Sequence, residues 1–195
     1  MLDLNAGQIA VTYDESGDAN QNAMFGEMKQ LDPVFGSRHE AAAVAPLLGL
    51  RLEEIAEQPP QTVSTGVPFC IVALRSVEAL ARLRVDAITS AQYLRGKDAK
   101  FFYVVAPEDD RVWRARMQFY GGEDPATGSA SGCAISYLVW HGLWPSGERL
   151  HLRQGVEMRR PSDLYISANF VSGKVVEVRV GGSTVPVAKG RLFLE

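Results

Sequence analysis

The feature that most constrains the fold is a long stretch without charged side chains. Between Asp124 and Glu148 the sequence contains no Asp, Glu, Lys or Arg, and from Ala130 to Leu143 small or apolar residues face nearly every side of a helix. A helix that is apolar all round is buried in a core and does not lie on its surface. Because glycines, serines and a proline interrupt the stretch, its continuous apolar part is shorter than the ~18 to 20 residues that a membrane span needs. The sequence therefore predicts a buried helix beginning near Ser129.

The remaining pattern is typical of an α+β protein with mostly antiparallel strands and few helices. Strands are expected where apolar runs or polar–apolar alternation end at turn residues, and helices where apolar residues recur at helical spacing. We expect both faces of the apolar strand 101–105 to be covered. The predicted strands are 8–13, 23–30 (the two forming a hairpin), 62–65, 69–74, 101–105, 112–119, 149–153, 164–170, 174–180 and 185–188, and the predicted helices are 38–48, a short turn at 52–56, and 77–83.

Composition narrows the class of protein. The net charge of −3, without a basic cluster, argues against a nucleic-acid partner. Cys70 and Cys133 lie in apolar surroundings, outside any C-x-x-C pair, and the three histidines are scattered. We therefore expect buried free thiols and no structural zinc. The first seven residues lack the basic and apolar regions of a signal peptide, which predicts a cytoplasmic protein that does not bind a membrane.

The run 123–130, Glu-Asp-Pro-Ala-Thr-Gly-Ser-Ala, leads into the buried helix. Thr127 or Ser129 can serve as the N-cap, and Gly128 lets a ligand approach the backbone. The first turn of a helix offers unpaired N–H groups and the positive end of the dipole, which favour a carboxylate or phosphate. Asp124 is close enough in sequence to share that ligand. Helix physics alone leaves the alternative that Asp124 and Thr127 only cap the helix.

This run resembles the signature of the PhzF family, relatives of phenazine-biosynthesis isomerases that share the diaminopimelate epimerase fold. Other runs resemble family motifs in the same order and extend the likeness over nearly all of the chain. They are 64–68 for a T-G-V-P turn, Arg116-Met117 for an R-M-F strand, 154–162 for a Q-G-x-x-x-G-R-P-S run, and Gly181-Gly182 before a final strand. Arg159 stands where the family usually has glycine.

The resemblance implies a fold in which two similar halves each wrap a curved, mostly antiparallel sheet around a central buried helix. The active site then lies between the halves. Asp124 is implied as a catalytic acid/base, with Glu123, Thr127, Gly128 and Ser129 binding the substrate. The implied reaction moves a proton on a small carboxylic acid without metal or organic cofactor. The family also suggests a homodimer.

Two family segments are absent from the sequence: a glutamate in a run like S-E-T and an F-A-G-H-P-T loop, both of the N-terminal half. Residues 4–11 resemble the strand that closes that half. We therefore predict that residues 1–30 are closing strands or an inter-domain region and that 31–195 form the C-terminal domain. Such a chain would be inactive or incomplete unless a separate N-terminal half joined it. The alternative is a non-catalytic binding or scaffold module that uses the retained cleft face.

Overall fold

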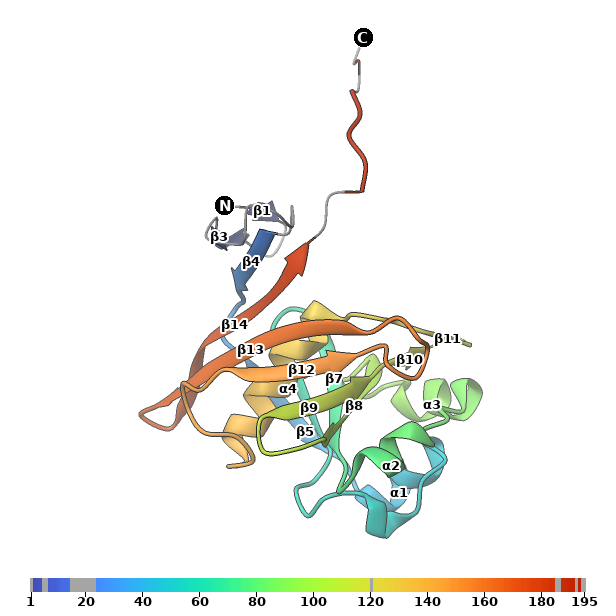
Figure 1. Cartoon of the computed structure of the whole chain (residues 1–195). Coiled ribbons are helices and arrows are strands. Elements are labelled where there is room, and N and C mark those ends of the chain that lie inside the picture. Colours follow the sequence, from blue (N-terminus) through green and yellow to red (C-terminus); the bar gives the residue numbers. More distant parts are fainter. Residues whose placement is uncertain are drawn as a thin grey trace.

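The computed structural model describes residues 2–4, 7–14, 24–119, 121–184, 187–191 and 193. Its main feature is a ten-stranded curved sheet wrapped around one helix (Figure 1). Neighbouring strands run antiparallel except in the pairs β12–β9 and β7–β8, which are parallel. In order across the sheet the strands are β3 (Val11–Asp14), β4 (Met24–Lys29), β14 (Lys174–Thr184), β13 (Ser162–Val171), β12 (Leu150–Gln154), β9 (Val112–Arg116), β8 (Phe101–Pro107), β7 (Pro68–Ala73), β6 (Gln61–Ser64) and β5 (Val34–Arg38).

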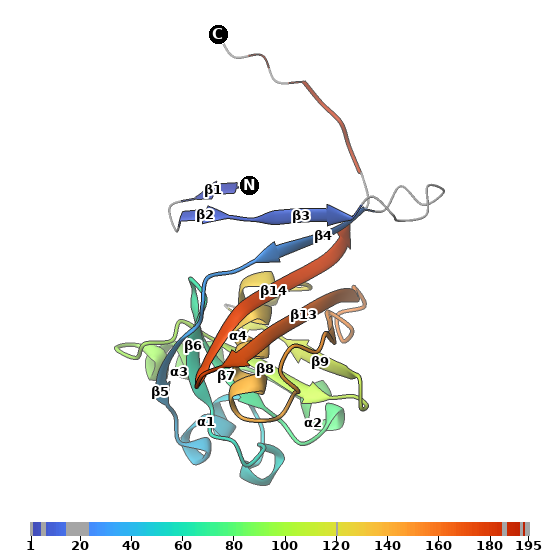
Figure 2. The same ribbon diagram turned by 90° about the vertical axis from the view of Figure 1, so that its left-hand side faces the viewer.

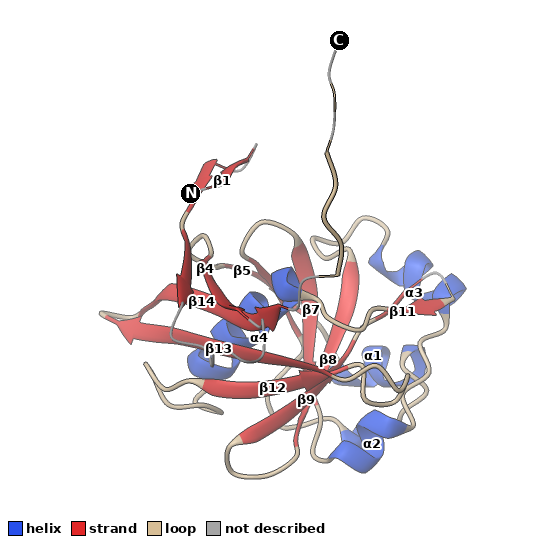
Figure 3. Cartoon of the chain, turned by 45° about the horizontal axis from the view of Figure 1, so that its top comes forward, coloured by secondary structure: helices blue, strands red, loops and turns tan. Residues whose placement is uncertain are grey.

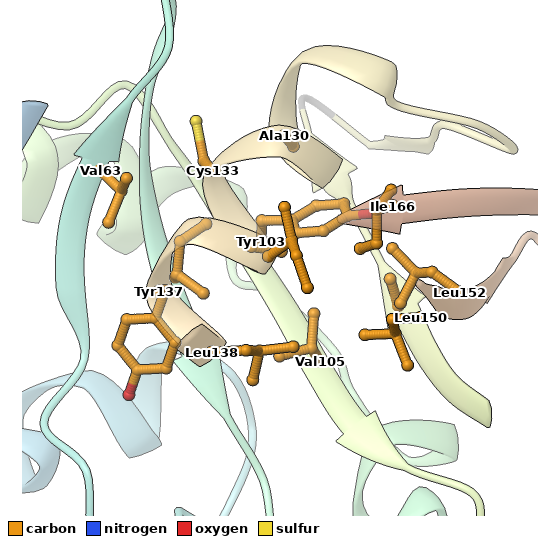
Figure 4. Packing of buried hydrophobic residues seen from close by; sticks show 14 of the residues in the cluster. Val63, Tyr103, Val105, Ala130, Cys133, Tyr137, Leu138, Leu150, Leu152 and Ile166 are labelled. Carbon is orange, nitrogen blue, oxygen red and sulfur yellow. The ribbon is translucent and has the colours of Figure 1, made fainter. Parts of the chain in front are cut away.

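Helix α4 (Gly128–Trp140) fills the inside of this curve, and every residue from Ala130 to Val139 is buried. Figure 4 shows its apolar side chains against those of β8, β12 and β13. The predicted central helix is confirmed, although it ends before Leu143. Gly142 adopts φ +70, its N–H donates to the carbonyl of Val139, and the N–H of Leu143 donates to the carbonyl of Leu138. This is a Schellman motif, which closes a helix at a glycine.

Three helices cover the other side of β7 and β8: α1 (Ala41–Leu47), α2 (Val77–Ala81) and α3 (Ala87–Leu94). Side chains alternate along β7, so that Ile71 packs toward α4 while Cys70 and Val72 belong to the cluster beneath α1–α3. Figure 3 shows α4 and the three outer helices on opposite sides of these two strands. A strand covered on both faces requires a continuous apolar run, which confirms the expectation for 101–105.

Other details differ from the prediction. The expected strand 8–13 is divided into β2 (Gly7–Ile9), which pairs with β1 (Leu2–Leu4), and β3, which forms the predicted hairpin with β4. Strand 112–119 ends as β9 at Arg116 and continues as β10 (Gln118–Phe119), which pairs with β11 (Gly122–Glu123). A 3-10 turn, η1 (Leu52–Glu54), lies within the predicted turn 52–56. The helix expected from Arg38 begins only at Ala41, and α3 was not predicted.

Residues 24–29 belong to the same sheet as the rest of the chain, because β4 pairs with β14 over six residues. Strands β1 to β4 lie beyond the N-terminal end of α4 (Figure 2). A domain boundary near residue 30 stays a prediction. Of the strand expected at 185–188, the first two residues lie outside the described part and the last two form no strand.

Candidate active site at the start of helix α4

The predicted site residues meet at the N-terminal end of α4. Of the two expected N-cap residues, Thr127 occupies the N-cap position. Its side chain, however, makes no capping hydrogen bond to the helix. Its hydroxyl instead donates to Oδ2 of Asp124 at 2.8 Å. The N–H groups of Gly128, Ser129 and Ala130 lie in the first turn, where a helix has no carbonyl to offer them. The arrangement places a carboxylate beside a helix end suited to an anion.

Asp124 is held by four hydrogen bonds. Besides the Thr127 hydroxyl, the N–H of Ala126 donates to Oδ1 at 3.3 Å. The backbone N–H of Asp124 donates to the carbonyl of Met117 at 2.9 Å, and its carbonyl accepts from the side-chain amide of Gln154 at 2.7 Å. The half-buried carboxylate therefore has a fixed position relative to the first turn of α4.

Glu123 points away into an ion pair. Its two carboxylate oxygens accept from Arg116 at 2.8 and 2.7 Å, and one also accepts from Gln118. Arg116 is buried and donates further to the carbonyls of Leu80 and Ala81 at the end of α2. Burial acts to raise the pKa of Glu123, but the hydrogen bonds from Arg116 and Gln118 outweigh it and hold that pKa below its ordinary value. Glu123 thus anchors the loop, and its role in substrate binding stays a prediction.

A second buried amide, that of Gln30, contacts α4. Gln30 donates to the carbonyl of Gly128 at 2.9 Å and accepts from the hydroxyl of Thr65 at 2.7 Å. It comes so close to the helix that a Cβ on Gly132 would lie 1.9 Å from its Oε1. Sequence reasoning missed Gln30, although a glycine in the middle of an apolar helix signals a close approach of this kind.

Two pockets flank the start of α4. One, of about 170 Å³, is lined by Ser129 together with Gln30, Thr65 and apolar residues. The other, of about 730 Å³, is lined by Ala126 and by residues of β3, β4, β13 and β14. Asp124 and Thr127 line neither pocket. Through Ser129, the smaller pocket borders the first turn of α4.

Cys70 and Cys133 are both buried free thiols, as predicted. Burial raises the pKa of the Cys133 thiol, so it stays protonated.

Within the described part of the chain, no three His, Cys, Asp or Glu side chains gather as a metal ion would require. Among those same residues, no helix combines the length and apolar character of a membrane span.

The structure is thus an α+β fold with a curved sheet around one buried helix. The sequence pattern of the PhzC-PhzF family, described as "Phenazine biosynthesis-like protein", matches residues 1–190, and the chain belongs to this family. It is 32% identical to an uncharacterised isomerase of Mesorhizobium japonicum over 165 residues, which are 78% of this chain and 54% of that protein. It is also 32% identical to the trans-2,3-dihydro-3-hydroxyanthranilate isomerase of Pseudomonas aeruginosa over 170 residues, 86% of this chain and 58% of that protein.

Solved structures share the fold. A predicted epimerase from Pseudomonas aeruginosa matches with a TM-score of 0.76 and 32% identity over 96% of this chain and 64% of that one. A probable proline racemase from Agrobacterium radiobacter matches with a TM-score of 0.57 at 10% identity, over 96% of this chain and 58% of that one, a likeness of fold alone. The curved sheet around a buried helix is thus confirmed. The chain spans a little over half the length of the curated relatives it matches.

Proposed function

We propose that this chain forms one wall of an isomerase site that moves a proton on a small carboxylic acid. The observation that carries the proposal is the start of α4, where the hydrogen-bonded carboxylate of Asp124 lies beside the first turn of the helix and two pockets lie near it. Relatives named as isomerases add support. The chemistry is acid/base catalysis by protein groups, without metal or organic cofactor.

Each predicted residue receives a role in this proposal. Asp124 takes the proton from one carbon of the substrate or returns it to another. Gly128 and Ser129 bind the substrate carboxylate through their N–H groups and the Ser129 hydroxyl. Thr127 orients Asp124, and Glu123 anchors the loop through Arg116 while contributing charge at the edge of the site.

A proton transfer of this kind uses a second acid/base group on the opposite side of the substrate. The carboxylate that lines the larger pocket, Asp163, is already paired with His151 at 2.7 Å. We propose that the second group comes from an N-terminal half like that of the longer relatives, and that the 195-residue chain is incomplete without it. Cytoplasmic location and a homodimer belong to the same proposal. Light scattering at micromolar concentration tests the dimer, and a clean monomer would contradict it.

The test is solvent deuterium exchange. The chain is incubated in D₂O with small carboxylic acids, including trans-2,3-dihydro-3-hydroxyanthranilate, alone and with the separately expressed N-terminal half of the Pseudomonas aeruginosa relative. We expect deuterium in the recovered acid only when both parts are present, and a loss of about 10²-fold or more in Asp124→Asn. Full exchange by the isolated chain would show that no second part is needed.

Gly128→Ala provides a matched variant for the binding step. A Cβ at this position would meet only Val180 Cγ1, at 4.0 Å, so the free protein accommodates it. A substrate carboxylate against the backbone would be displaced, and the KM should rise while stability stays unchanged. If Asp124→Asn and Gly128→Ala leave binding of every acid unchanged, the site is elsewhere and the chain is better described as a non-catalytic interaction module.

A further inference from the structure

The side-chain amide of Gln154 connects four groups around Asp124 and Thr127 by hydrogen bonds. Gln154 ends strand β12 and its side chain has no exposed surface. Its Nε2 donates to the carbonyl of Asp124 at 2.7 Å and to the hydroxyl of Thr127 at 2.8 Å. Its Oε1 accepts from the N–H of Thr127 at 3.1 Å and from the hydroxyl of Tyr103 at 2.8 Å. All four hydrogen-bonding positions of the amide are therefore used.

Backbone groups fix the orientation of this amide. The N–H of Thr127 only donates and the carbonyl of Asp124 only accepts, so the amide oxygen must face the first and the amide nitrogen the second. Tyr103 is compatible with this orientation. Burial raises the pKa of its hydroxyl above the ordinary value, so the hydroxyl keeps its proton and can donate to Oε1.

The direction of the next hydrogen bond follows. Since the amide nitrogen of Gln154 only donates, the Thr127 hydroxyl accepts from it. That hydroxyl has one proton, and Oδ2 of Asp124 lies 2.8 Å away in position to receive it. Oδ2 is thereby held as an acceptor. Oδ1 has only the longer contact of 3.3 Å with the N–H of Ala126.

We infer that Gln154 is a positioning residue that directs the Thr127 hydroxyl proton to Oδ2 of Asp124 and leaves Oδ1 as the oxygen that takes up or releases a proton. The inference deepens the proposed function and depends on it for its meaning in catalysis. Gln154 touches no reacting atom. It acts through Thr127, and it also holds the carbonyl of Asp124 so that the whole loop keeps its position.

The experiment is carbon-13 NMR of the Asp124 carboxyl carbon, recorded at one neutral pH in the full chain and in three variants. Thr127→Val removes the donor to Oδ2, and the carboxyl signal should move. Thr127→Ser keeps the hydroxyl and should restore the wild-type signal position. Gln154→Met should also move the signal, although Gln154 does not contact the carboxylate. An unmoved signal in Thr127→Val and Gln154→Met would overturn the inference.

A second measurement covers the case in which Gln154→Met does not fold. In the wild-type chain, the Gln154 side-chain amide protons should exchange slowly with solvent and show a nuclear Overhauser contact with Thr127; fast exchange and no contact would overturn the inference. Deuterium exchange into substrate, measured on the same proteins after the N-terminal half of the Pseudomonas aeruginosa relative is added, separates the two proposals. Exchange with an unmoved carboxyl signal rejects the role of Gln154 and keeps the function. A moved signal without exchange into any acid rejects the function and keeps the hydrogen-bond assignment.

Discussion

The two ends of helix α4 are built in different ways. At the end of the helix, bulky side chains close the core: Tyr137 donates to the carbonyl of Pro59, and Trp140 packs against Phe35 and Phe170. At the start of the helix the residues are small, and two buried glutamines reach in from neighbouring strands to hydrogen-bond with the loop and the first turn. The C-terminal end is closed mainly by packed aromatic side chains. The N-terminal end is held by directed hydrogen bonds from two amides, and the pockets lined by Ser129 and Ala126 lie next to it, as the proposed binding site requires.

The largest loss of stability is expected from Gly155→Ala, which disturbs the loop that leads into the helix. Gly155 has φ +78, and a Cβ there would lie 2.3 Å from the carbonyl oxygen of Arg160 and 3.0 Å from that of Pro125. Backbone atoms cannot move aside as a flexible side chain can, so the free energy of unfolding should fall by about 2 to 5 kcal/mol in urea denaturation.

Gly173→Ala is the matched control. Gly173 has the same φ of +78, but nothing lies within 4 Å of an added Cβ. It should lose only the backbone contribution, about 1 to 2 kcal/mol. Equal losses in the two variants would show that the contact between Gly155 and the loop at Pro125 does not matter for stability.

Gly132→Ala should have an intermediate effect. The new methyl group would displace Gln30, which would lose its hydrogen bonds to Gly128 and Thr65. That loss of about 1 to 3 kcal/mol exceeds the ~1 kcal/mol that alanine gains over glycine in a helix. In a Gln30→Ala background the obstacle is gone, and the same substitution should be neutral or stabilising. A destabilisation that persists in the double variant would place its cause elsewhere.

Tyr137→Phe probes the packed end of the helix. It removes one buried hydrogen bond to the carbonyl of Pro59 and should lower the free energy of unfolding by about 1 kcal/mol. Binding of a carboxylate at the other end should not change. Weaker binding in this variant, under conditions where it is fully folded, would mean that the two ends are not independent.

The smallest expected effect is the dependence of stability on pH, which differs between the two ends of the helix. Burial, and then the charge of Arg38, lowers the pKa of His141 at the packed end. The unfolded chain therefore takes up this proton first, and stability should begin to fall as the pH drops below about 6.5. The stability from the lowered pKa of Glu123 is present above about pH 4.5 and is lost as the pH falls through its folded value.

Matched variants assign these two steps. His141→Gln should remove part of the loss that begins near neutral pH, and Glu123→Gln part of the loss at acid pH, both followed by denaturant midpoints. Identical pH profiles for the wild type and both variants would contradict the assignment.

The core of the fold was predictable because it depends on local patterns. An uncharged stretch predicts a buried helix wherever it folds, and a continuous apolar run predicts a strand covered on both faces. Helix α3 carries a signal that could have been read, since Asp86 accepts from the N–H groups of Ile88 and Thr89 as an N-cap. Gly181 was read as the end of a strand, but it makes room for the ring of Phe25, which would lie 2.6 Å from a Cβ there.

The site was predictable only in part. The properties of a helix start are local, so the loop 123–130 could be identified as a possible anion site from its own residues. Only the resemblance to the PhzF family favoured a substrate site there over simple helix capping, and that choice stays a prediction. The contacts of Gln30 and Gln154 could not be predicted, because the fold brings each of them to α4 from a distant part of the chain. A glutamine has no residue-type signal that identifies its partner. Its hydrogen-bond partners can be assigned only from the folded structure.

The most direct test of the central claim is an NMR titration of backbone amides with a small cyclic carboxylate such as benzoate. The account predicts saturable shifts of the N–H signals of Gly128, Ser129 and Ala130 at the start of α4, reduced in Gly128→Ala, while the signals of Trp140 to Leu143 at the other end stay unmoved. Shifts confined to another part of the chain, or none at any concentration, would contradict the claim that this helix start binds the substrate.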